Sequence, residues 1–216
     1  ERVLGFETRD IVIFSMAKLA ESRDPETGNH LERIRYYSKA LAETLASSEN
    51  PPEEIDRLFI DNIFRTSPLH DIGKIGTPDH VLLKPGRLDD KEFEIMKSHS
   101  RIGFETLNDA LMRYPKADYL KMSAEIALSH HEKFDGSGYP EGLKGQQIPI
   151  AARIVALSDV YDALVSKRVY KDAYPSDMAK AIILQGNSTH FDPMMVIAFL
   201  ACENSFIQIS ERFRDN

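Results

Sequence analysis

The sequence predicts an all-α fold, a bundle of helices. Apolar residues recur at intervals of three and four through most of the chain, so that Leu31, Ile34, Leu41 and Leu45 fall on one helical face. The alternation of apolar and polar residues that marks half-buried strands is not found, and neither is an internal repeat. Stretches rich in proline and glycine divide the helical pattern into segments.

Each helix is expected between two such breaks. Asp24 and Pro25 provide a capping side chain and a first-turn proline, so they predict a helix start. The stretches 47–56 and 134–149 are expected to be loops, because prolines, glycines and polar residues gather there. The predicted helices cover about residues 6–20, 31–45, 53–67, 89–111, 117–131, 151–165, 176–184 and 193–204.

The composition is typical of a soluble globular protein, with 216 residues, 28% charged and 42% hydrophobic. A net charge of −7 argues against a surface that coats a nucleic-acid polymer, although bound metal ions could still attract a small phosphorylated substrate. The single cysteine, Cys202, cannot form a disulfide within the chain and is expected in the core. No uninterrupted apolar stretch reaches the ~18 residues of a membrane span, so a cytoplasmic location is expected.

Several histidines and carboxylates lie close to one another in the sequence, in pairs and short motifs that suggest a metal site. Taken singly, each has an ordinary explanation: a lone helical histidine is usually structural, and a His-Asp or His-His pair occurs by chance. Asp159 is more unusual, because an aspartate in an apolar helical run needs a partner when buried. On a regular helix Glu26 and His30, four residues apart, would point the same way. The candidates are Glu26, His30, His70, Asp71, His99, His130, His131 and Asp159.

Imidazole and carboxylate groups suit first-row divalent ions such as iron, manganese, zinc or nickel. Carboxylates such as Asp71 or Asp159 can bridge two ions. Two close metal ions can hold a phosphoryl group, lower the pKa of a water and stabilise a leaving oxygen. The residue set therefore indicates metal-dependent phosphoryl chemistry.

Over residues 23–200 the chain resembles the HD-GYP subgroup of the HD-domain phosphohydrolases. The HHExxDGxGYP pattern of that subgroup is highly specific, and Phe134 in place of its common tryptophan is a minor departure. The matching motifs are Glu26-Thr27-Gly28-Asn29-His30, His70-Asp71-Ile72-Gly73-Lys74, Lys84-Pro85-Gly86, His99, His130-His131-Glu132-Lys133-Phe134-Asp135-Gly136-Ser137-Gly138-Tyr139-Pro140, Ser158-Asp159-Val160-Tyr161-Asp162, Arg168-Val169-Tyr170-Lys171 and Phe191-Asp192-Pro193.

The resemblance implies a five-helix HD core with added helices and a centre of two or three divalent ions, iron or manganese first and zinc or nickel next. Glu26 matches a glutamate of members that hold a third ion, although a carboxylate there could instead cap a helix. The implied metal ligands are His30, His70, Asp71, His99, His130, His131 and Asp159, and the implied substrate-binding residues are Lys74, Tyr139, Arg168 and Lys171.

The residue chemistry agrees with these substrate roles but leaves alternatives. Lys74 lies one helical turn past His70 and can place its ammonium beside a phosphate. Arg168 and Lys171 are three residues apart, so they can form a cationic patch that binds phosphates; the alternative is that both are solvated surface charges. Tyr139 can present a ring to a base or a hydroxyl to a phosphate, or can serve only in a structural turn or a partner-docking surface.

The resemblance implies a metal-dependent phosphodiesterase that hydrolyses cyclic di-GMP to the linear dinucleotide pGpG, with a second cut to GMP left open. In that mechanism a metal-activated hydroxide attacks phosphorus, and Asp71 and Lys74 are the catalytic residues. The rivals are hydrolysis of cyclic GMP-AMP, and a dinucleotide-sensing module that docks proteins through the loop 134–149. Residues 1–22 are expected to connect a regulatory domain to the phosphodiesterase domain 23–216.

Overall fold

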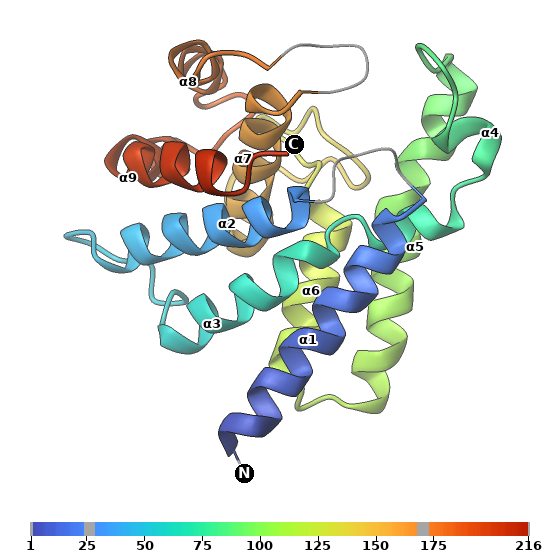
Figure 1. Ribbon diagram of the computed structural model, residues 1–216, viewed down its shortest axis with the longest axis horizontal. Helices are drawn as coiled ribbons and strands as arrows, with labels where there is room; N and C mark the ends of the chain where they lie inside the picture. Colours follow the sequence, from blue (N-terminus) through green and yellow to red (C-terminus); the bar gives the residue numbers. More distant parts are fainter. Residues whose placement is uncertain (1, 24–28, 168–172, 216) are drawn as a thin grey trace.

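The computed structural model describes residues 2–23, 29–167 and 173–215, and its architecture confirms the all-α prediction (Figure 1). Within these ranges there is no strand, only an isolated parallel bridge between Asn187 and Phe191. The helices are α1 (Arg2–Glu21), α2 (His30–Ala46), α3 (Arg57–Thr66), α4 (Asp79–Leu82), α5 (Asp90–Arg113), α6 (Asp118–Ser129), α7 (Ile150–Val165), α8 (Ser176–Gln185) and α9 (Pro193–Arg212). The 3-10 turns are η1 (Ser67–Leu69), η2 (Ile72–Gly76) and η3 (Gly145–Gln147).

Two apolar clusters hold the bundle together. The larger lies where α2, α7 and α9 pack, and includes the fully buried Tyr37, Leu157 and Phe199. The smaller lies under α1, where Ile13 and Ala17 pack with residues of η1, α5 and α6. Figure 1 shows α1 crossing the face of the bundle, with α2 and α9 on one side of it and α5 on the other. The described metal-site candidates come from segments on both sides of α1, such as His30 on α2 and His99 on α5.

Side-chain caps explain where several helices begin. Asp56 accepts a hydrogen bond from the backbone N–H of Phe59 at 2.7 Å, so α3 begins at Arg57 and not near residue 53 as predicted. Asp89 and Glu92 form a reciprocal capping box at the start of α5, which matches the prediction within one residue. The predicted helix start at residues 24–25 lies outside the described residues.

Helix α9 is longer than predicted, because it continues past residue 204 to Arg212 through a bend at buried Cys202. By length and composition α9 is also the one helix of the described residues that could cross a membrane, with a mean hydropathy of 1.3. The expectation of no such segment rested on uninterrupted apolar runs, and a core helix of a globular protein can meet the same length and hydropathy test. One face of α9, including Val196 and Phe206, is buried in the larger cluster, so its apolar character has a role in the core.

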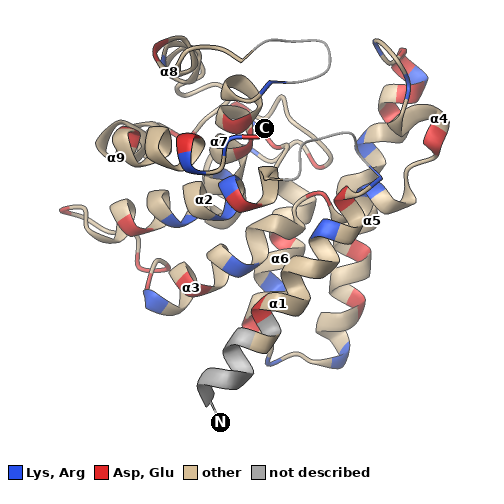
Figure 2. Ribbon diagram, viewed as in Figure 1, with Lys and Arg blue, Asp and Glu red and all other residues tan. Residues whose placement is uncertain are grey.

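The negative charge is not gathered on one helix. Figure 2 shows Asp and Glu interspersed with Lys and Arg along the helices in that view. Ion pairs join distant segments, such as Arg65 on α3 with Asp10 on α1 at 2.6 Å. The net charge therefore does not by itself define a binding face.

A close backbone approach joins η2 to α5. A Cβ atom built on Gly73 would lie 1.9 Å from the carbonyl oxygen of His99 and 2.5 Å from the backbone nitrogen of Gly103. Gly103 is itself tight, because its Cβ would lie 3.3 Å from the Gly73 nitrogen. Only glycine permits this contact, which brings Asp71 and His99 into one region.

Replacement of Gly73 by alanine should therefore destabilise the fold by about 3 kcal/mol, since backbone atoms cannot make room as a flexible side chain can. Gly86→Ala is the matched control: Gly86 has φ 106° but nothing within 4 Å of the added Cβ, so only about 1 kcal/mol of strain is expected. Thermal and urea unfolding of the two variants measure the difference. Equal losses would show that the approach of η2 to α5 is not a tight constraint.

Candidate metal centre

Short turns place the His-Asp pair. His70 and Asp71 lie between η1 and η2, and His70 Nδ1 is 2.9 Å from the carbonyl oxygen of Ser67. His70 is fully buried, so a peptide carbonyl is the natural acceptor for its Nδ1–H. This hydrogen bond leaves His70 Nε2 to face Asp71 at 3.3 Å.

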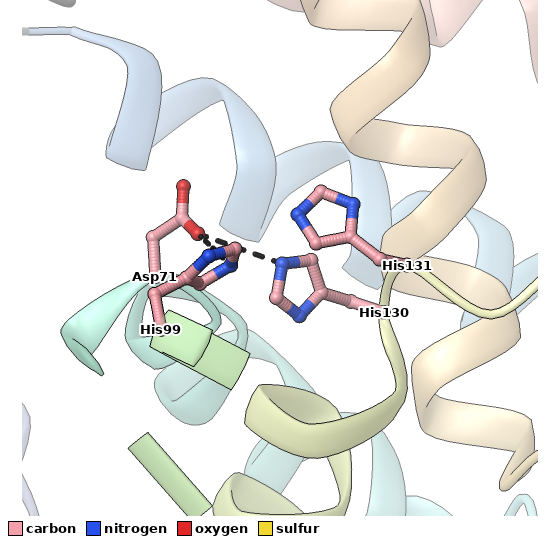
Figure 3. A group of neighbouring side chains, drawn as sticks. All are labelled: Asp71, His99, His130 and His131. Atoms are coloured by element: carbon pink, nitrogen blue, oxygen red, sulfur yellow. Dashed lines mark ion pairs between the residues drawn. The ribbon is translucent and has the colours of Figure 1, made fainter. Parts of the chain in front are cut away.

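The first cluster of donors consists of Asp71, His99, His130 and His131, whose ligand atoms all lie within 4.8 Å of one another (Figure 3). His99 projects from the middle of α5, and the two adjacent histidines follow the last residue of α6. Asp71 Oδ1 is 3.1 Å from Nε2 of His99 and 3.5 Å from Nε2 of His130. One carboxylate oxygen is thus shared between two imidazoles.

The second cluster consists of His30, His70 and Asp159, again within 4.8 Å of one another. His30 is the first residue of α2, and Asp159 projects from α7. His30 Nε2 lies 3.8 Å from Asp159 Oδ1, and the rings of His30 and His70 meet edge to face at 5.5 Å.

Asp71 connects the two clusters. Its Oδ1 faces the first cluster, whereas its Oδ2 faces His70 of the second. The rings of His70 and His130 are 5.2 Å apart, so the clusters are contiguous. A carboxylate with one oxygen directed to each cluster has the placement needed to bridge two ions.

The donor set suits divalent metal ions. Nε2 of His70 and Nε2 of His130 are buried and lie 3.3 and 3.5 Å from the Asp71 carboxylate without hydrogen-bond geometry to it or to another described residue. Buried imidazole nitrogens without a hydrogen bond are costly unless something else fills their coordination. Together with the carboxylates of Asp71 and Asp159 they provide the nitrogen and oxygen ligands that first-row divalent ions prefer.

The electrostatics keep the centre ready for cations. Burial alone would raise the pKa of Asp71, but the charges of Lys74 and His70 outweigh it and hold that pKa well below its usual range. Burial, followed by repulsion from His130, holds the pKa of His131 well below the ordinary histidine value. Burial also lowers the pKa of His130. The ionised carboxylate of Asp71 beside the neutral imidazoles of His130 and His131 presents lone pairs and not protons.

Two predicted substrate-binding residues lie beside these clusters. Lys74 Nζ is 2.8 Å from Asp71 Oδ2, so its ammonium is at the edge of the donor set. The Tyr139 ring stacks on His131 with 4.7 Å between ring centroids. Burial and the charges of Asp71 and Asp159 raise the pKa of Tyr139, which keeps its phenol protonated.

Three predicted site residues lie outside the described residues: Glu26, Arg168 and Lys171. Helix α2 begins at His30, after the turn residue Asn29. The argument that Glu26 and His30 point the same way on one regular helix therefore has no support from the bounds of α2.

Two buried carboxylates near the centre were not predicted as site residues. Asp162 lies three residues after Asp159 on the same helix and contacts His30 Nδ1 at 2.8 Å. Glu132 accepts hydrogen bonds from the backbone N–H groups of Glu141 and Leu143, so it holds the loop 134–149 beside the histidine pair. The three-residue spacing from Asp159 was the available signal for Asp162.

Comparison with known proteins agrees with this arrangement. A "cyclic di-GMP phosphodiesterase" of Vibrio cholerae is 51% identical over 96% of this chain and 42% of its own length. A protein of the same description from Thermotoga maritima is 44% identical over 91% of this chain and 50% of its own. A "3'3'-cGAMP-specific phosphodiesterase 2" of Vibrio cholerae is 38% identical over 97% of this chain and 38% of its own length. The chain thus spans half or less of the length of these relatives.

The fold is also found in a solved structure. The crystal structure of a cyclic GMP-AMP phosphodiesterase of V. cholerae superposes with a TM-score of 0.61 at 18% identity, covering 94% of this chain and 52% of that one. The family profile described as "HD domain" matches residues 15–195. The chain therefore belongs to the HD domain family, in the HD-GYP subgroup that its motifs predict.

Proposed function

We propose that the chain is a metal-dependent phosphodiesterase that hydrolyses cyclic di-GMP. The observation that carries the proposal is the position of Asp71, with one oxygen toward His99 and His130 and the other toward His70 and Lys74. Addition of water across one phosphodiester bond breaks the bond to the 3′ oxygen and yields linear pGpG with a 5′-phosphate. A second such cut would yield GMP.

The two clusters would each hold a divalent ion, with Asp71 between them. When bound, the ions supply positive charge for the phosphate and lower the pKa of a water. The chain's own contribution is to fix the ligand geometry. The Nδ1 contacts of the histidines turn Nε2 inward, and burial of His70, His99 and His130 limits competing water.

Lys74 and Tyr139 are placed to act on the substrate. The Lys74 ammonium, already beside Asp71, can stabilise charge on the phosphate oxygens and donate a proton toward the leaving 3′ oxygen. Tyr139 offers a protonated hydroxyl and an aromatic ring at the His131 side of the centre. Phe93 of α5 meets the Tyr139 ring at 6.2 Å, which extends the aromatic surface.

A second candidate function differs from the first only in one base of the substrate, adenine in place of guanine. The relatives described as cyclic di-GMP phosphodiesterases reach 51% and 44% identity, and those described as 3'3'-cGAMP-specific reach 38% and 34%. Cyclic di-GMP is therefore the favoured substrate, with cyclic GMP-AMP as the alternative. A sensing and docking module with little activity is disfavoured, because a sensor does not need so many buried donors.

The remaining parts of the proposal concern the ions and the wider protein. Iron or manganese is favoured, with zinc and nickel next, because histidine and carboxylate donors suit all four. We further infer a cytoplasmic setting, protein partners at the loop 134–149, and an upstream regulatory domain joined through residues 1–22. Helix α1 contacts η2, the turn that carries Lys74, so a movement of α1 would shift the position of Lys74 beside the metal centre.

Asp71→Ala should abolish hydrolysis of cyclic di-GMP, a loss of at least about 100-fold, because the shared carboxylate is removed. Bound metal should fall while the helical circular dichroism spectrum is retained. The assay uses metal-reconstituted protein with cyclic di-GMP and 3'3'-cGAMP in parallel, and exposed Asp109→Ala on α5 is the control. Near-normal turnover of the Asp71 variant with full metal content would contradict the assignment, and faster turnover of 3'3'-cGAMP would reverse the substrate choice.

Replacing Arg168 and Lys171 together by alanine should raise the Michaelis constant about tenfold or more and leave metal content unchanged, since two charged contacts to phosphate are lost. The matched control is Arg113→Ala with Lys116→Ala, two exposed cations that are also three residues apart. Steady-state kinetics and metal analysis give both readouts. If the first pair behaves like the control pair, Arg168 and Lys171 are surface charges.

Glu26→Gln tests for a third ion, because glutamine keeps the size of the side chain but removes the charge. If Glu26 is a ligand, wild-type protein holds three ions per chain under metal-replete conditions and the variant holds two. Metal analysis together with anomalous scattering measures the count. Two ions in both proteins would mean that the centre is binuclear and that Glu26 has another role.

A further inference from the structure

His30 differs from three other histidines of the centre in the group that contacts its Nδ1. Those three pair Nδ1 with a backbone carbonyl oxygen of the preceding turn: His70 with Ser67 at 2.9 Å, His99 with Met96 at 2.7 Å and His130 with Ile126 at 3.0 Å. His30 Nδ1 instead lies 2.8 Å from Oδ2 of Asp162, a residue of α7. A side chain from another helix therefore sets the orientation of this one ring.

Asp162 can only accept hydrogen bonds where it lies. It is 1% exposed, and Arg33 donates to Oδ1 through Nε at 2.6 Å and to Oδ2 through a terminal nitrogen at 3.1 Å. Ser166 donates its hydroxyl to Oδ2 at 3.3 Å. A carboxylate surrounded by these donors is ionised and accepts only, so the proton between Asp162 and His30 belongs to Nδ1.

The position of that proton decides what His30 can bind. A neutral imidazole carries one N–H, so with Nδ1 protonated the lone pair is on Nε2. His30 Nε2 is the atom that lies 3.8 Å from Oδ1 of Asp159, a donor of the same cluster. The ring is thus held in the tautomer that a metal ion requires.

We propose that Asp162 is a positioning residue of the metal centre, which holds His30 in the Nδ1–H tautomer and directs Nε2 to the ion that His70 and Asp159 would share. This inference rests on the proposed function, because it assumes that the second cluster binds a metal. A carboxylate partner also makes the imidazole a stronger donor than a peptide carbonyl partner does. His30 is therefore expected to contribute strongly to affinity at the second cluster.

Arg33 extends the contact to the end of the chain described by the structure. Its other terminal nitrogen donates to the carbonyl oxygen of Phe213 at 2.8 Å and lies 2.9 Å from Oδ2 of Asp215. Arg33 is 2% exposed, so its buried positive charge needs a negative partner whether or not the centre binds a metal ion. The competing explanation is accordingly that Asp162 serves only to balance Arg33.

The variant Asp162→Asn separates these explanations. Arg33 should keep the amide oxygen on its own side, which places the amide NH2 toward His30 Nδ1. The ring must then accept at Nδ1 and carry its proton on Nε2, the tautomer that cannot bind a metal through Nε2. A residue that only balances Arg33 would alter stability and leave the tautomer unchanged.

The chain offers a matched control in the pair formed by buried Asp192 and largely buried Arg153, whose side chains are 2.5 Å apart and for which no contact with a candidate ligand is found among the described residues. Asp192→Asn also removes a buried carboxylate from an arginine. It should cost stability in a similar way without any change at His30.

The first measurement is a long-range 1H–15N NMR spectrum of the histidine rings in metal-free protein. Wild type and Asp192→Asn should show His30 protonated at Nδ1, and Asp162→Asn should show it protonated at Nε2. Wild-type protein with His30 protonated at Nε2 would overturn the proposal without any variant. The inference therefore stays open to contradiction even if Asp162→Asn does not fold.

The second measurement is titration with Mn2+, followed by calorimetry and metal counting. Wild type should bind Mn2+ at both clusters, and Asp162→Asn should keep the affinity of the first cluster while that of the second weakens by about 10–100-fold. Unchanged binding at both sites, with an unchanged tautomer, would show that Asp162 only balances Arg33. Wild-type protein that binds no Mn2+ would contradict the proposed metal centre itself, a result distinct from either outcome for Asp162.

Discussion

The buried negative charge of Asp71 is the constraint around which the centre is arranged. A carboxylate removed from water is costly unless charges and hydrogen-bond donors compensate it. Here Lys74 supplies a positive charge 2.8 Å from one oxygen. The Nε2 atoms of His70, His99 and His130 also lie within 3.5 Å of the carboxylate, and where they carry lone pairs the balance is completed by a cation bound between them and Asp71. These partners come from η2, the η1–η2 junction, α5 and the end of α6, so compensation of one charge ties together four parts of the chain.

Backbone packing makes that compensation geometrically possible. Gly73 lets η2 lie directly against the backbone of α5 at His99, and Gly103 makes room for η2 one turn further on. Two residues before Gly73, Asp71 is thereby fixed against α5 at the level of His99. On the other side, the larger apolar cluster joins α2 to α7, which sets the distance between His30 and Asp159. Rigid helices with short turns suit a site that needs ligand positions within fractions of an ångström.

Apolar periodicity predicted the longer helices, since each buries one face, but it missed the four-residue α4, and the bounds depended on local chemistry. The Asp56 cap places the start of α3 at Arg57, after the predicted start. The bend at Cys202 lets α9 continue beyond the residue where the apolar periodicity weakens. Motif resemblance identified the side chains that the fold brings together, yet it could not divide them into two clusters, because that depends on which helices pack. Asp162 was missed for the same reason: its meaning comes from His30 and Arg33, 132 and 129 residues away.

Asp71 and Asp162 are both buried carboxylates in contact with a histidine, and their other partners distinguish their roles. Asp162 is held by the planar guanidinium of Arg33, which donates to both oxygens and is itself anchored at Phe213. Such a pair is fixed in direction, and it leaves Asp162 no capacity for an added ligand. The partners of Asp71 are a lysine ammonium and imidazole Nε2 atoms, and a divalent cation placed among them would balance the buried charge. The nature of the compensating group therefore separates a carboxylate that orients a ligand from one that can itself become a ligand.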